Sequence, residues 1–129
     1  MGQCYDVNLK VRFKDEEGAK RALRAKIARG KQEHVLYDVQ GLRMKGFDFD
    51  NIRDLMSVFF CEWGDRLRPA ADEAWLNSGF NASYGWESVM MDAFEKIAPF
   101  LEDGSEIIIY PDSDYDKAEV TNGKAIWVH

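Results

Sequence analysis

Three aspartates at alternating positions, Asp112, Asp114 and Asp116, are the clearest candidate for metal binding in the sequence. Carboxylate oxygens are the ligands that calcium prefers, and an EF-hand loop opens with this spacing. The same loop needs glycine at its sixth position and glutamate at its twelfth, where this chain has Lys117 and Gly123. Because aspartate and its neighbours here are common turn formers, we expect a turn and no metal site.

Zinc needs cysteine and histidine ligands at set spacings, and the four such residues in the chain lack them. They are Cys4, His34, Cys61 and His129, with no C-x-x-C or H-x-x-x-H pair among them. A nucleophile such as Cys61 or Ser83 would need a paired base, and the G-x-S-x-G turn that presents a catalytic serine is absent. We assign no catalytic residue, no metal and no cofactor.

Adjacent acids occur at Asp72 and Glu73 and again at Glu102 and Asp103. Two carboxyl groups act as general acid and base only where a pocket raises the pKa of one of them, and a sequence pattern does not reveal a pocket. Neither glycine-rich phosphate-binding motif, G-x-x-x-x-G-K-[ST] or G-x-G-x-x-G, is present. We therefore expect these acids to be solvated, and we expect no nucleotide hydrolysis.

Large aromatic residues, interleaved with polar ones, gather between positions 75 and 86: Trp75, Phe80, Tyr84 and Trp86. Aromatic side chains near polar loops are favoured at protein interfaces, because they bury much area with little loss of entropy. Core packing is the alternative, since tryptophan and tyrosine are mostly buried in any fold. We predict a partner-binding surface at these four residues.

A second predicted partner-binding surface is basic and is formed by Lys20, Arg21 and Arg24. Residues 1–31 hold nine of the 17 Lys and Arg but only four of the 23 Asp and Glu, so the remainder of the chain is acidic. The alternative is a solvated face that complements this acidic remainder. The net charge of −6 and the absence of an RNP-type aromatic motif argue against nucleic-acid binding.

Hydrophobic periodicity predicts the elements that position these residues. In the N-terminal half we expect a strand over 4–13, a helix from the cap Asp15 to Gly30, a strand over 34–39, a loop or weak hairpin over 40–48, and a helix from the cap Asp50 to Gly64. Cys61 lies about 160° from the apolar stripe of that second helix. Since cysteine is usually buried, we expect a neighbouring loop to cover it.

The C-terminal half reads as one more helix and a run of short strands. We expect a loop over 66–71, a strand over 73–78, a helix that begins at Ser83 or Tyr84 and is interrupted at Pro99, and strands over 105–110, 115–121 and 124–128. The dipeptide Asn122-Gly123 predicts a two-residue hairpin between the last two strands, because both of its residues must take positive φ.

This order of elements predicts an α+β fold, a two-layer sandwich in which a mainly antiparallel sheet carries three helices on one face, in a ferredoxin-like variant. We expect residues 1–129 to form a single domain, because the length and the 46% share of hydrophobic residues fit one core. The strand over 124–128 could be an exposed edge that pairs across a two-fold axis, so monomer and homodimer both stay open.

The sequence favours a small non-catalytic binding or regulatory protein that acts through a protein–protein interface. Two alternatives stay open: a small-ligand-binding protein or enzyme with an acidic and aromatic pocket, and nucleic-acid association through the basic first helix. No apolar run approaches the roughly 20 residues of a membrane span, and the first residues lack the basic and apolar blocks of a secretory signal. Since two cysteines suit a reducing compartment, we expect the cytoplasm.

Overall fold

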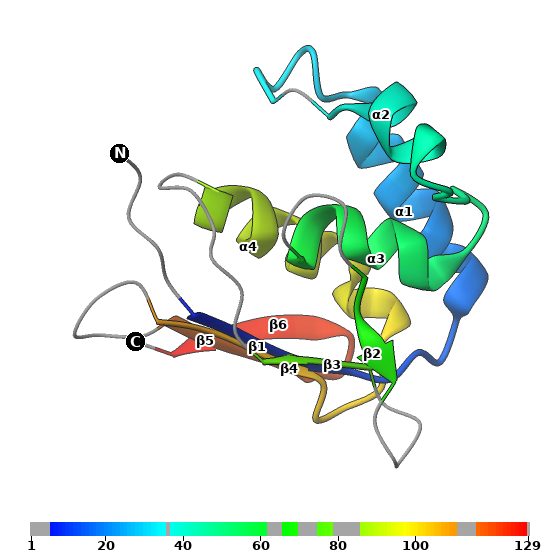
Figure 1. The fold of residues 1–129 in the computed structure, drawn as a ribbon. Coiled ribbons are helices and arrows are strands. Elements are labelled where there is room, and N and C mark those ends of the chain that lie inside the picture. The colour runs from blue at the N-terminus through cyan, green and yellow to red at the C-terminus, as the bar shows by residue number, and fades with distance from the viewer. Residues whose placement is uncertain are drawn as a thin grey trace.

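The computed structural model describes residues 6–35, 37–61, 66–69, 75–78, 86–110 and 116–128, which form a six-stranded sheet with helices over one face (Figure 1). No helix in these ranges is long and apolar enough to cross a membrane. The elements in chain order are β1 (Asp6–Val11), α1 (Glu16–Ala28), α2 (Val39–Met44), α3 (Ile52–Phe60), β2 (Arg68–Pro69), β3 (Trp75–Ser78), α4 (Trp86–Ile97), the 3-10 turn η1 (Ala98–Phe100), β4 (Glu106–Tyr110), β5 (Asp116–Thr121) and β6 (Lys124–Val128).

The strands lie in the order β2-β3-β1-β4-β5-β6, and every neighbouring pair is antiparallel. β1 and β2 therefore run parallel with β3 between them, and β3 and β4 run parallel with β1 between them. The first crossover passes through α1, α2 and α3 and the second through α4, which gives two interleaved split βαβ units. This connectivity is consistent with a ferredoxin-like variant, extended at β4 by β5 and β6. The predicted α+β class and antiparallel sheet are confirmed, and the helices lie on one face, but the described chain has four helices, α1 to α4, where three were predicted.

The core lies between the sheet and helices α1, α3 and α4. On the central strand β1, alternate residues Val7, Leu9 and Val11 have no exposed area, as the period of a half-buried strand requires. The register sets Val7 opposite Ile109 and Leu9 opposite Ile107 on β4, and both isoleucines are fully buried. The helices close the core with apolar residues at helical spacing: Leu23 on α1, Leu55, Met56 and Phe59 on α3, and Met90, Phe94 and Ile97 on α4.

The predicted first helix is confirmed as α1. The Asp15 side chain accepts a hydrogen bond from the Gly18 N–H at 3.0 Å, which satisfies one of the donors left free at a helix start. Glu16 and Glu17 lie at the positive end of the helix dipole. The helix ends at Ala28, close to the expected stop at Gly30.

The predicted strand over 34–39 and the loop or hairpin over 40–48 are both wrong. His34 has a φ of 59° and belongs to a turn that follows α1, so extended backbone does not begin there. Asp38 instead accepts a hydrogen bond from the Gly41 N–H at 3.0 Å and caps α2. The alternation of apolar residues in this segment was short, and a local capping bond outweighs it.

Smaller differences concern where elements begin and end. α3 is capped by Asn51, whose side chain accepts from the Asp54 N–H at 3.1 Å, and not by Asp50. The helix ends at Phe60, and Gly64 lies outside the described residues. The expected loop over 66–71 contains the two-residue strand β2, which pairs with β3. Pro99 lies in η1 directly after α4, which fits an imino acid that lacks a backbone donor.

The predicted two-residue hairpin is confirmed between β5 and β6. Thr121 and Lys124 are register partners, and Asn122 and Gly123 have φ values of 52° and 76°. A Cβ on Gly123 would lie 3.5 Å from Pro99 Cα, an ordinary contact, so any cost of a side chain there comes from the backbone conformation.

Gly123→Ala is therefore expected to destabilise the protein by about 1 kcal/mol, because a residue with a Cβ is strained at positive φ. The free energy of unfolding, measured by urea titration, provides the check. Asn122→Gly is the matched control, and we expect it to change that free energy by less than about 0.5 kcal/mol. Equal effects of both substitutions would contradict this account of the turn.

Candidate functional site

The predicted aromatic surface is only partly within the described structure. Trp86 lies at the start of α4, where its indole N–H donates to the Phe59 carbonyl oxygen at 3.0 Å and its ring meets Tyr37 edge-on with centroids 6.2 Å apart. Trp75 is on β3 opposite Val11 in the register, whereas Phe80 and Tyr84 lie outside the described residues. Trp86 thus contributes to core packing, and the surface as a whole stays a prediction.

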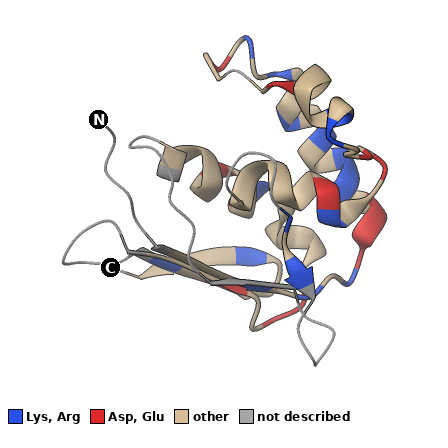
Figure 2. Cartoon of the chain, viewed as in Figure 1, with Lys and Arg blue, Asp and Glu red and all other residues tan. Residues whose placement is uncertain are grey.

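Two of the three predicted basic residues bind within the chain. Lys20 Nζ donates to the Asp50 carbonyl oxygen at 3.0 Å and pairs with Glu17 at 2.8 Å. Arg24 donates to the Phe49 carbonyl oxygen at 3.2 Å and pairs with Asp50 at 2.8 Å. Both side chains therefore tie the segment before α3 to α1. Arg21 is exposed, and Figure 2 shows that Lys and Arg also occur along the rest of α1.

An ion pair between a buried lysine and a partly exposed aspartate joins α1 to α4. The Lys26 side chain is 3% exposed, and its ammonium lies 2.6 Å from Asp92 Oδ2 and 3.5 Å from Glu33 Oε1. Burial alone would lower the pKa of Lys26, but the hydrogen bond to Asp92 and the nearby negative charges outweigh it and raise the pKa above the ordinary 10.5. This lysine is therefore a cation that holds two helices together.

The Tyr37 hydroxyl is buried beside this ion pair, and it has no hydrogen-bond partner among the described residues. Burial raises the pKa of Tyr37 above the ordinary 10.0, and the positive charge of Lys26 opposes the rise only in part. The Tyr37 ring packs edge-on against Phe59 with centroids 5.5 Å apart. Tyr37 is therefore a packing residue with a polar tip.

Asp54 on α3 is a buried carboxylate, and it is also held by contacts within the chain. It accepts hydrogen bonds from the Asp48 N–H at 2.8 Å and from Arg66 Nε at 2.7 Å. The Arg66 guanidinium lies over the Phe47 ring, 4.3 Å from its centroid. This arrangement secures the segments on either side of α3.

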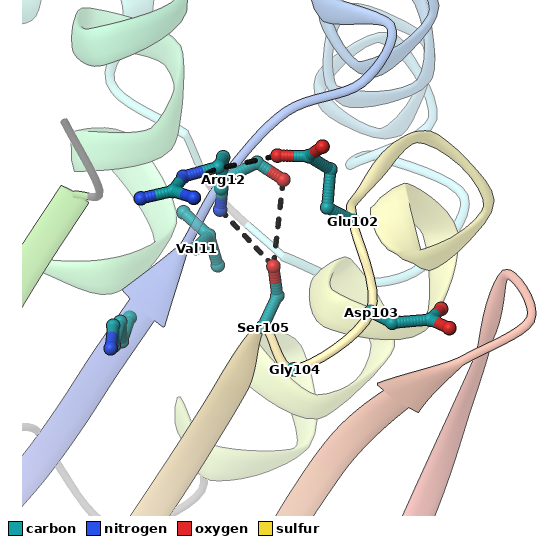
Figure 3. Close-up of a pocket in the computed structure, with 7 residues that line it drawn as sticks. Val11, Arg12, Glu102, Asp103, Gly104 and Ser105 are labelled. Carbon is teal, nitrogen blue, oxygen red and sulfur yellow. Dashed lines mark hydrogen bonds and ion pairs between the residues drawn. The ribbon is translucent and has the colours of Figure 1, made fainter. Parts of the chain in front are cut away.

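An open concavity of about 430 Å³ lies where β1 ends and β4 begins, and Figure 3 shows the residues around it. The buried Ser105 hydroxyl accepts from the Arg12 N–H at 3.1 Å and faces the Arg12 carbonyl oxygen at 3.5 Å. The Arg12 guanidinium lies 3.8 Å from Glu102 Oε2, with both side chains about half exposed. Asp103 Oδ1 accepts from the Asn122 N–H at 3.0 Å.

Four polar residues of this concavity therefore interact with one another or with the backbone, namely Arg12, Glu102, Asp103 and Ser105. Ser105 has no described histidine or carboxylate that would activate it as a nucleophile. This concavity does not match the predicted alternative of an acidic and aromatic pocket, because none of its lining residues is aromatic. The lining residues are Lys10, Val11, Arg12, Glu102, Asp103, Gly104 and Ser105.

The remaining sequence candidates for chemistry do not gather into a site. No group of three or more His, Cys, Asp or Glu residues suited to a metal occurs in the described part of the chain. Cys61 is 7% exposed, so the expectation that it is buried is confirmed, while its cover by a neighbouring loop stays a prediction. Cys4, Asp112 and Asp114 lie outside the described residues.

A different kind of surface lies on the face of the sheet that is turned away from the helices. It includes the edge strand β6. Alternate residues of β6 face that side, with Ile126 49% and Val128 51% exposed. β6 pairs only with β5 among the described strands and is one of the two edges of the sheet. An edge strand presents unpaired backbone N–H and C=O groups, which are able to bind another strand.

Comparisons of this chain with family models, curated proteins and solved structures gave no match.

Asp92→Asn is expected to destabilise the protein by roughly 2–3 kcal/mol, because it leaves the buried Lys26 charge with only the more distant Glu33. Lys26→Met is expected to cost less, since the Asp92 side chain is 42% exposed and water can solvate it. Urea unfolding of both variants provides the check. A larger loss of stability for Lys26→Met than for Asp92→Asn would contradict the inference that the buried Lys26 charge depends on Asp92.

Stability is expected to fall as the pH rises above about 10. The folded-state pKa values of Lys26 and Tyr37 both exceed their ordinary values of 10.5 and 10.0, so the folded chain binds more protons than the unfolded chain in this range. Thermal unfolding between neutral pH and pH 12 tests this expectation. In the double variant Lys26→Met with Tyr37→Phe, the alkaline loss should be smaller than in the wild type, and an unchanged loss would contradict it.

Proposed function

We propose that this chain is a non-catalytic binding protein of the cytoplasm, and that its partner is a protein which adds an extended strand to β6. The observation that carries the proposal is the asymmetry of the two edges of the sheet. The described part of β2 is Arg68–Pro69, and a proline has no N–H to donate to another strand, so this part of the edge is poorly suited to strand addition. β6 is five residues long and contains no proline.

The backbone of β6 supports strand addition. In the two-residue turn, the Thr121 carbonyl group faces the Lys124 N–H, so the backbone groups of Lys124 point toward β5. Backbone direction alternates along a strand, and therefore Ile126 and Val128 also point toward β5. Ala125 and Trp127 point outward, and each offers one donor and one acceptor to an added strand.

The side chains of β6 support an apolar contact with that strand. Ile126 and Val128 are two of the three large hydrophobic residues found exposed in the described chain, the third being Met44 on α2. The only charge on β6 is Lys124 at its beginning. An added strand would cover both apolar side chains while pairing the outward backbone groups, as in β-augmentation.

The roles of the polar residues support binding over catalysis. Ser105, Asp54 and Lys26 each hold parts of the fold together in the contacts described above. The predicted aromatic surface is distinct from β6, because its residue Trp75 lies on β3, which β1, β4 and β5 separate from β6 in the sheet. It remains a second predicted partner surface.

Ala125→Pro is expected to abolish partner binding without unfolding the chain, because it removes an outward donor and leaves the groups that face β5 intact. The tagged protein is incubated with an extract of the cell that produces it, and the captured chains are compared between wild type and variant by mass spectrometry. Amide hydrogen exchange in the complex should show protection at Ala125 and Trp127.

Met44→Lys is the matched control, because it places a charge at another exposed apolar residue, 83% exposed and on α2. It should capture the same chain as the wild type. Ile126→Lys serves if Ala125→Pro fails to fold, since Ile126 is half exposed. Capture that persists in folded Ala125→Pro or Ile126→Lys would refute the proposed role of β6.

A further inference from the structure

We infer that the strand added to β6 is β6 of a second copy of this chain, antiparallel to the first and related to it by a two-fold axis at Ile126. The inference rests on the proposed function and names the partner. It depends on three features of β6, namely its backbone register, its side-chain sizes and the position of its one charge.

The backbone register selects the position of the axis. With the axis at Ile126, Ala125 of one copy lies opposite Trp127 of the other, and both are residues whose backbone groups point outward. Two such pairs form in the dimer, and they join every outward N–H and C=O of the two strands. An axis at Ala125 or Trp127 would pair that residue with its own copy and leave the other outward residue without a partner inside Lys124–Val128.

The side chains fit this register. Ala125 and Trp127 are register neighbours of the buried residues Val120 and Ala118, so they lie on the helix side of the sheet. The axis at Ile126 places a small side chain opposite a large one at both ends of the contact. On the open face the two Ile126 side chains meet as a non-hydrogen-bonded pair, which brings Cβ atoms to about 4.5–5.5 Å.

The charge on β6 is also compatible with a second copy. In an antiparallel pair the two Lys124 residues lie at opposite ends, about 13 Å apart for four residues of strand. A parallel pair in register would set them side by side. Each chain carries a net charge of −6, but the strand that forms the contact carries only this one positive residue. The repulsion between two acidic chains is therefore not concentrated at the interface.

The length of β6 sets the expected strength of the dimer. Five residues of strand extend about 17 Å, which places the contact at the low end of specific interfaces. We therefore expect a reversible dimer with a dissociation constant of about micromolar order, formed and lost with dilution.

The test is a charge exchange at the axis, followed by sedimentation analysis of the purified full chain from about 1 to 200 µM. Wild type should change from monomer to dimer over this range. Ile126→Lys and Ile126→Glu should each weaken dimerisation by at least about tenfold, because like charges face each other across the axis. An equimolar mixture of the two variants should recover the dimer, since lysine then faces glutamate. Met44→Lys should dimerise as the wild type does.

Three outcomes would overturn the inference. They are a wild type that stays monomeric at the highest concentration, a dimer that Ile126→Lys does not weaken, and a mixture that does not recover association. If the purified chain does not dimerise through β6, but capture of another protein still depends on Ala125, then β6 binds an added strand and the partner is not this chain. If that capture also fails, the proposed function is wrong as well.

Discussion

Burial of a single face of the sheet is the constraint on which the rest of the structure depends. Val7, Leu9 and Val11 of β1 face the helices with no exposed area, and β1 pairs with both β3 and β4. A slip of one residue would turn that apolar set to the open face, so burial fixes the register of the central strands. The pairing of β4 with β5 and of β5 with β6 then sets the register of β6, and this register determines which residues of the edge strand are exposed.

Elements with a long or chemically distinct signal could be predicted from the sequence. The alternation in β1, the cap at Asp15 and the Asn122-Gly123 turn all rest on local interactions that each segment makes with itself or with one neighbour. The segment from His34 to Met44 could not be predicted, because its alternation spans few residues and competes with a cap at Asp38. β2 exists only because β3 lies beside it, and a two-residue strand leaves no periodic pattern.

The candidate site was harder to predict than the fold, because the type of a residue does not show which group of the folded chain its side chain contacts. Lys20 and Arg24 are basic residues on an exposed helix, and only the tertiary structure brings Asp50 to them. Trp86 has the composition of an interface residue, yet its indole N–H is taken by Phe59. Strand 124–128 could be proposed as an edge because it is the last strand of a hairpin, whereas the presence of Pro69 in the strand at the opposite edge required the structure.

The anchoring of β6 decides whether its edge is a suitable binding surface. Trp127 Nε1 donates to Glu95 Oε1 on α4 at 2.7 Å, and the Trp127 ring meets Phe94 edge-on at 6.4 Å. All five residues of β6 have register partners on β5, and the tight turn at Asn122 fixes where the strand begins. A strand held from three directions loses little conformational freedom when another strand pairs with it, and binding that requires little ordering retains more of its interaction energy. The contacts that attach β6 to the fold thus also prepare its outer edge for a partner.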